Sequence, residues 1–170
     1  AFILQTAVWS GKPWAEVAPW VSDGDRYVDA EDADTGPCPY GNLVGGMLAS
    51  LALFAPEDPR LPRWLESARK SMRSSGSLDI DSGTCEWLLY LESFRGAIES
   101  ARALAGWATP IYEGSDKPPA LLRWKLQLCH YHAASNDPDQ GILTAEEGLQ
   151  LAEQCGLHRH DAAFTALRTY

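Results

Sequence analysis

Apolar residues recur at helical spacing along most of the chain. Between residues 61 and 75 they fall at positions i, i+3, i+4, i+7 and i+11, which is one face of a helix. Charged side chains take the opposite face, and Gly76 supplies a C-terminal stop. The pattern therefore predicts an amphipathic helix over 61–75, with a buried face made of Leu61, Trp64, Leu65, Ala68 and Met72.

The clearest start and stop signals belong to a helix predicted over 139–155. Asp137 can cap its first turn, and Pro138 suits the first helical position. Gly156 suits the left-handed conformation that often ends a helix. The expected buried stripe of this helix consists of Ile142, Ala145, Leu149 and Ala152.

The same reasoning predicts further helices, separated by breaks rich in Gly, Pro, Asp and Ser. One such break is expected at SSGSLDIDSG, residues 74–83, and an acidic linker is expected near 23–37. No segment shows convincing strand alternation. Because most connections are short, successive helices should be antiparallel neighbours. The predicted helices lie near 2–10, 14–22, 41–55, 61–75, 84–95, 97–109, 119–135, 139–155 and 158–169.

A faint internal repeat supports stacking of these helices. The tetrapeptide ESAR occurs at 66–69 and again at 99–102, and EWLLYLESF at 86–94 aligns with RWKLQLCHY at 123–131. In each pair, the number of residues from the first segment to the second lies near the roughly 34 to 47 residues that a helical pair occupies in solenoid proteins. We therefore predict an all-α fold, a right-handed, solenoid-like, tetratricopeptide-like stack of about four antiparallel helical hairpins. It would form a single domain over 1–170.

Charge and hydropathy limit the partners and the cellular environment that can be expected for this chain. The net charge is −9 and the 14 Lys and Arg residues are scattered, so direct nucleic-acid contact by this segment is not expected. The longest apolar run, 43–55, has 13 residues, which is too short to cross a bilayer. The first residues also lack the basic region of a signal peptide. We expect a soluble, cytoplasmic protein without a membrane partner.

Two segments combine cysteine and histidine, LCHYH at 128–132 and CGLHRH at 155–160. Zinc requires four such ligands in tetrahedral geometry. If the two helices form a hairpin, however, these segments lie at opposite ends of it. A structural role is therefore the preferred interpretation. The alternative, a small metal-binding helical domain, would use Cys129, His132, Cys155 and His158.

No sequence motif indicates that the chain is an enzyme. The sequence contains no P-loop, nucleophile elbow or zinc-protease motif, so we expect neither catalysis nor a cofactor. Tryptophans on apolar helix faces, such as Trp64 and Trp124, are expected in the packed interior. If stacked hairpins form a groove, aromatic residues of inner helices can contribute to an interaction surface: Tyr90, Trp124 and Tyr131. End repeats with exposed tryptophans can also self-associate.

Three segments carry a resemblance to a known family: PEDPRLPRW at 56–64, RWKLQLCHYHAASND at 123–137 and AEEGLQLAEQCGLH at 145–158. They resemble the helical repeat region of MalT-like, LuxR-type bacterial transcriptional regulators. In that family a P-loop ATPase of the STAND type precedes a superhelix of tetratricopeptide-like repeats, often with a DNA-binding helix-turn-helix at one end.

This resemblance implies that the chain is a fragment of a larger regulator, acting in signal transduction and transcription regulation. It would be a non-catalytic sensor or scaffold that binds a protein or a small-molecule effector, while ATP and DNA are handled elsewhere. A structural spacer without any ligand is the remaining alternative.

Overall fold

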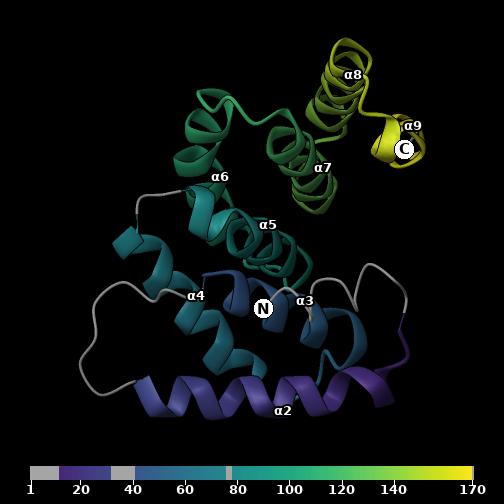
Figure 1. Cartoon of the computed structure of the whole chain (residues 1–170). Helices are drawn as coiled ribbons and strands as arrows, with labels where there is room; N and C mark the ends of the chain where they lie inside the picture. Colours follow the sequence, from purple (N-terminus) through teal and green to yellow (C-terminus); the bar gives the residue numbers. More distant parts are fainter. Residues whose placement is uncertain (1–11, 32–40, 76–77, 170) are drawn as a thin grey trace. The chain divides into compact units, whose positions relative to one another are not determined.

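The computed structural model describes residues 12–31, 41–75 and 78–169, and every regular element in these ranges is helical (Figure 1). The predicted all-α class is confirmed for this part of the chain. The helix predicted over 2–10 lies outside it. The elements are α2 (Trp14–Glu31), α3 (Gly41–Phe54), α4 (Leu61–Ser75), α5 (Leu78–Phe94), α6 (Ile98–Glu113), α7 (Pro118–Ala134), α8 (Pro138–Cys155), the 3-10 helix η1 (His158–His160) and α9 (Asp161–Arg168).

The helices with strong local signals are found where they were predicted. The bounds of α4 match, and all five residues of its predicted apolar face are buried. At the start of α8 the carboxylate of Asp137 accepts a hydrogen bond from the backbone N–H of Gln140, and Pro138 occupies the first turn. Gly156 ends α8 with φ 65°, in the left-handed region.

Two predicted breaks are helical instead. α2 continues to Glu31, so residues 23–31 are not a linker, while 32–37 lie outside the described residues. α5 begins at Leu78 and contains Gly83, which the sequence pattern places in a break between two helices. A Cβ on Gly45 of α3 would lie 2.8 Å from the backbone carbon of Gly83. The missing side chain of Gly45 therefore allows α3 to approach the backbone of α5 closely at Gly83.

The chain divides into two compact units, Ala1–Leu88 and Leu89–Tyr170, and the division falls within α5. The expectation of one continuous domain stays a prediction. In the first unit α3 packs against α2 and α4. In the second unit α6, α7, α8 and α9 pack in chain order, each against the next (Figure 1).

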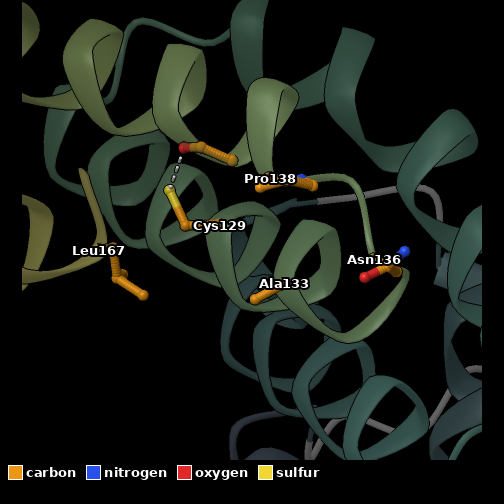
Figure 2. A pocket seen from close by; sticks show the side chains of 6 residues that line it. Cys129, Ala133, Asn136, Pro138 and Leu167 are labelled. Carbon is orange, nitrogen blue, oxygen red and sulfur yellow. Dashed lines mark hydrogen bonds between the residues drawn. The ribbon is translucent and has the colours of Figure 1, made fainter. Parts of the chain in front are cut away.

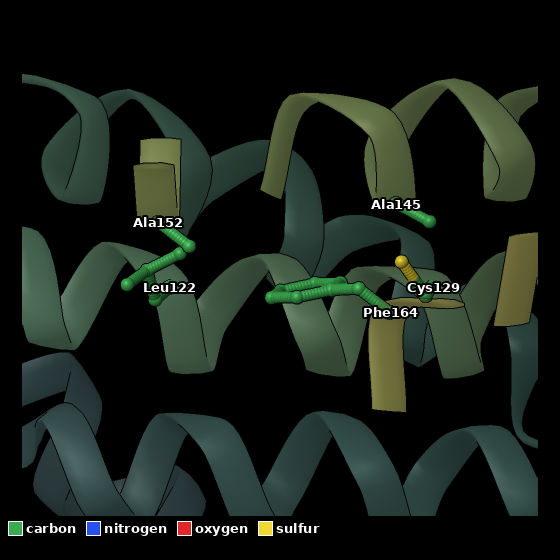
Figure 3. Close-up of a cluster of buried hydrophobic side chains, with 5 residues drawn as sticks. All are labelled: Leu122, Cys129, Ala145, Ala152 and Phe164. Atoms are coloured by element: carbon green, nitrogen blue, oxygen red, sulfur yellow. The ribbon is translucent and has the colours of Figure 1, made fainter. Parts of the chain in front are cut away.

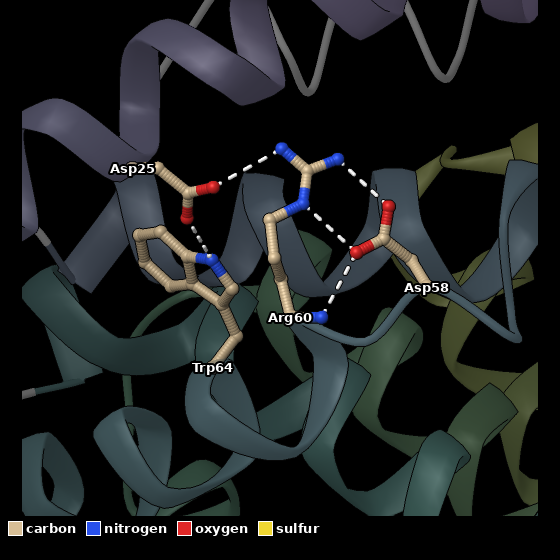
Figure 4. A network of polar contacts seen from close by, with 4 residues as sticks. All are labelled: Asp25, Asp58, Arg60 and Trp64. Atoms are coloured by element: carbon tan, nitrogen blue, oxygen red, sulfur yellow. Dashed lines mark hydrogen bonds and ion pairs between the residues drawn. The ribbon is translucent and has the colours of Figure 1, made fainter.

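A polar network joins α2 to the start of α4 in the first unit (Figure 4). One carboxylate oxygen of Asp25 accepts a hydrogen bond from Trp64 Nε1 at 2.7 Å, and the other pairs with Arg60 Nη1 at 3.1 Å. Arg60 also binds Asp58 through Nη2 at 2.7 Å and Nε at 2.8 Å. These hydrogen bonds lower the pKa of Asp58 below its usual value. Asp25 thus links α2 to residues at the start of α4.

The core of the second unit is shared by three helices. Figure 3 shows side chains of α7, α8 and α9 meeting in one cluster of Leu122, Cys129, Ala145, Ala152 and Phe164. On the α6 side of α7, Trp124 stacks on Tyr112 with ring centroids 4.6 Å apart and planes 4° from parallel. α7 is therefore covered from both sides.

Candidate functional site

The three aromatic residues predicted for an interaction surface differ in exposure. Trp124 has no exposed surface, and its indole N–H donates to Thr109 Oγ1 at 3.0 Å. It supports the packing of α6 on α7 and is not part of a surface. Tyr131 is largely buried, while Tyr90 is half-buried. Only these two remain candidates for contact with a partner.

Tyr131 lies at a groove that runs across α6, α7 and α8, with a volume of about 440 Å³. We call it the α6–α8 groove. Small residues of α6, such as Ala105 and Gly106, leave the space open, and a Cβ on Gly106 would meet no atom within 4 Å. Leu128 and Tyr131 of α7 add apolar surface. The complete lining is Arg102, Ala105, Gly106, Thr109, Pro110, Glu113, Lys125, Leu128, Tyr131, His132, Thr144 and Glu147.

Charged side chains of both signs lie along this groove. Lys125 of α7 pairs with Glu147 of α8 at 2.7 Å, and its side chain is only 12% exposed. Arg102 of α6 interacts with the Tyr131 hydroxyl and pairs with Glu99 at 2.8 Å, and these contacts raise the pKa of its guanidinium. Lys125 and Glu147 thus link α7 to α8, and Arg102 and Tyr131 link α6 to α7.

The antiparallel course of the helices gives the groove two different ends. Glu113 closes α6 just before the turn into α7, so it lies toward the end where Lys125 and Glu147 pair. Arg102 lies toward the opposite end, with Tyr131. Along α7, the distance from Lys125 to the end of the groove at Tyr131 is roughly 10 Å, at about 1.5 Å per residue. That length matches about three residues of an extended polypeptide.

His132 lines the groove at the end that holds Arg102. Its Nδ1 is buried without a hydrogen-bond partner, and the nearest carboxylate oxygen, of Asp137, is 3.9 Å away. Burial lowers the pKa of His132, and Asp137 opposes that shift. In a neutral imidazole one ring nitrogen is a hydrogen-bond donor and the other an acceptor.

A second, smaller cavity of about 280 Å³ lies beside the turn from α7 to α8 (Figure 2). The Cys129 thiol on its wall donates to the Gly141 carbonyl at 3.7 Å. Burial raises the pKa of Cys129 to about 12, so this thiol is protonated and uncharged at neutral pH. The wall is formed by Cys129, Ala133, Asn136, Pro138, Gly141 and Leu167.

The four residues of the metal-binding alternative have separate environments. Cys129 belongs to the core cluster, whereas Cys155 is exposed at the end of α8. His158 Nδ1 lies 2.9 Å from a carboxylate oxygen of Asp161. Within residues 12–31, 41–75 and 78–169, no three His, Cys, Asp or Glu side chains are grouped so that they could hold a metal ion. The structure therefore gives this alternative no geometric support.

An aromatic cluster at the end of α5 was only partly anticipated. Tyr90 packs against Phe94 with centroids 4.5 Å apart, and the His130 ring of α7 lies 5.6 Å from Tyr90. Phe94 is 60% exposed. Burial lowers the pKa of His130. These rings pack on one another, so the cluster joins α5 to α7 and adds an exposed apolar edge.

Sequence reasoning missed most of the residues that line the α6–α8 groove. Thr109 and Thr144 are polar residues on otherwise apolar helix faces, and Gly106 interrupts a helix of good formers. Such departures from a regular pattern indicate a position where packing is relaxed. They do not reveal which helices meet there, since that depends on the order of packing in space.

Comparison of the chain with protein-family models, curated proteins and solved structures gives no match. Across the described segments, every helix is too short or too polar to serve as a membrane span.

Proposed function

We propose that this chain is a non-catalytic helical-repeat region that binds a segment of a partner protein in the α6–α8 groove. The observation that carries the proposal is the groove itself, a space of about 440 Å³ bounded by three successive helices. Its lining combines apolar surface with charges of both signs, which is the composition of many protein-binding surfaces.

The packing order of the second unit supports repeat-like stacking. Helices α6 to α9 contact one another in chain order, and α7 has neighbours on both sides. Stacked antiparallel helices of this kind create extended surfaces that recognise polypeptides. A right-handed, tetratricopeptide-like solenoid that includes the first unit is part of the same proposal.

The proposed role in a transcriptional regulator of the MalT-like, LuxR type is supported by the resemblance of three sequence segments. In such a protein, a partner would act by preferring one arrangement of the stacked helices. It would shift the equilibrium by the difference in its affinity for the two arrangements, and by no more than that. The reading frame that encodes the chain tests this role, since a P-loop upstream and a helix-turn-helix downstream are expected.

A blocked groove tests the binding proposal directly. Gly106→Trp places an indole in the α6–α8 groove, where an added Cβ meets no atom within 4 Å. Ala103→Trp is the matched control, because Ala103 is exposed on the same helix and does not line the groove. Peptides selected from a random-sequence display library on the wild-type chain supply the ligands, and fluorescence anisotropy measures their affinities.

The expected result is a loss of affinity of about tenfold or more in Gly106→Trp, equivalent to about 1.4 kcal/mol. Ala103→Trp should bind these peptides as the wild-type chain does. Equal binding by both variants would show that the peptides use another surface, and a library that yields no binder would count against the groove as a polypeptide site.

A further inference from the structure

The cavity beside the turn from α7 to α8 has properties that the α6–α8 groove lacks. The two sites share no lining residue. We call the smaller one the Cys129 pocket. It differs in that α9 contributes a wall, through Leu167, whereas the groove is lined by α6, α7 and α8. Figure 2 shows Leu167 and Asn136 on opposite sides of Cys129.

The chemistry of the Cys129 pocket selects against charged ligands. Among the described residues that line it, no side chain carries a charge, and the thiol is protonated at neutral pH. A charged group brought into such a site would lose its hydration without gaining an ion pair. The polar groups that remain are the Asn136 amide and backbone atoms, which can hydrogen-bond a neutral hydroxyl or amide.

The volume of the pocket sets the size of the occupant. An apolar cavity of about 150 Å³ is enough to hold benzene. The Cys129 pocket, at about 280 Å³, has room for roughly one fused pair of rings or an equivalent short hydrocarbon. This is just below the range of about 300–1,000 Å³ for sites of drug-sized ligands.

The position of α9 depends on contacts next to this pocket. Phe164 of α9 is fully buried against α8, and Leu167 packs on the same core cluster. When α9 leaves the core, the pocket loses the wall that Leu167 provides. A ligand bound in the complete pocket must therefore stabilise the docked position of α9, by linkage.

We propose that the Cys129 pocket binds a small, uncharged, mainly apolar molecule, and that its occupancy favours the docked state of α9. This goes beyond the proposed function, because it concerns a different site and a different class of ligand. A chain that binds no peptide in the groove should still bind the small molecule in the Cys129 pocket.

The first test uses the 170-residue chain and a matched pair of probes. At neutral pH 2-naphthol is uncharged and 2-naphthoate is an anion of similar shape. Binding is followed by two-dimensional amide NMR spectra. Saturable shifts are expected with 2-naphthol at the amides of Cys129, Gly141 and Leu167, together with affinity for 2-naphthoate that is lower by about tenfold or more.

Pocket-filling variants locate the site. Ala133→Phe places a ring in the pocket, and Ala133 is exposed, so the larger side chain does not displace the core. Ala134→Phe is the control, since Ala134 is also exposed but does not line the pocket. We expect Ala133→Phe to lose 2-naphthol binding and Ala134→Phe to keep it. Equal affinity for both probes, unchanged binding by Ala133→Phe, or no saturable shift would overturn the proposal.

Hydrogen exchange tests the coupling to α9. If the amides of α9 exchange through undocking, a free ligand concentration of ten times Kd should slow their exchange by about elevenfold. Ala133→Phe should show no such slowing with 2-naphthol. Saturable binding that leaves α9 exchange unchanged would overturn the coupling.

Discussion

The ring of Phe164 lies where a side chain on Gly148 would begin, since a Cβ on Gly148 would be 2.5 Å from Phe164 Cε1. Gly148 is in the middle of α8, where glycine weakens a helix relative to alanine. Its presence is explained by the close approach of α9. This contact lies in the core cluster of the second unit and sets how deeply α9 is seated.

We expect Gly148→Ala to destabilise the docking of α9. Overpacking against the rigid Phe164 ring costs about 1–3 kcal/mol, and the gain in helix propensity offsets at most about 1 kcal/mol of that. Gly106→Ala is the matched control and should be neutral or slightly stabilising, because its Cβ enters open space. Amide exchange in α9 and the free energy of unfolding in urea are measured for both variants. A Gly148→Ala chain as stable as Gly106→Ala would contradict the packing described.

The hydrogen bond between Trp124 and Thr109 should contribute measurably to the packing of α6 on α7. Thr109→Val removes the acceptor and leaves a buried indole N–H without a partner, which costs about 1–3 kcal/mol. Thr165→Val, at an exposed position of α9, should change the free energy of unfolding by no more than about 0.5 kcal/mol. Urea unfolding monitored by tryptophan fluorescence distinguishes them, and similar midpoints would argue against this hydrogen bond.

Two aspartates of α2 should respond differently to truncation. Asp25→Ala removes the partner of Trp64 Nε1 and one of the two carboxylates bound to Arg60, so a loss of about 1–3 kcal/mol is expected. Asp23→Ala removes only an exposed pair with Arg26, which contributes about 1 kcal/mol at most. Circular dichroism during urea unfolding tests the difference. Comparable losses in both variants would show that the network does not stabilise the α2–α4 contact.

Stability of the second unit should fall in mild acid. Burial lowers the pKa of His130, His132 and His160 below the ordinary value of 6.5. As the pH falls through that value, the unfolded chain therefore binds more protons than the folded chain. The free energy of unfolding should therefore decrease as the pH falls through about 6.5, the ordinary pKa of histidine. His130→Gln should reduce this slope. A stability that rises on acidification through the same pH would contradict the assigned burial.

The cysteines should differ in reactivity toward iodoacetamide. Cys155 is exposed and should be alkylated in the folded chain at neutral pH, whereas Cys129 is buried with a pKa of about 12 and lacks the reactive thiolate. Mass spectrometry of proteolytic peptides identifies the labelled positions. The urea-unfolded chain, in which both residues react, serves as the control. Rapid alkylation of Cys129 in the folded chain would show that the core around it is open.

Residues far apart in the chain account for the features that sequence reasoning missed. Residues 23–31 of the linker expected near 23–37 are helical, and Asp25 within them is bound by Arg60, 35 residues away. Gly83 was interpreted as a break because its partner, Gly45, is invisible to a local pattern. Trp124 was assigned both to the interior and to a possible surface, and the stack with Tyr112 places it in the interior.

Local sequence patterns are enough to predict the helical class and the bounds of α4, α7 and α8 to within about one or two residues. They are enough because apolar periodicity, the Asp137 cap, Pro138 and the Gly156 stop act over a few neighbouring residues. The helix faces that enclose the groove and the Cys129 pocket follow from the packing of the helices and not from local patterns. These cavities exist because side chains from separate helices meet at fixed distances, and that meeting depends on the packing of the whole unit.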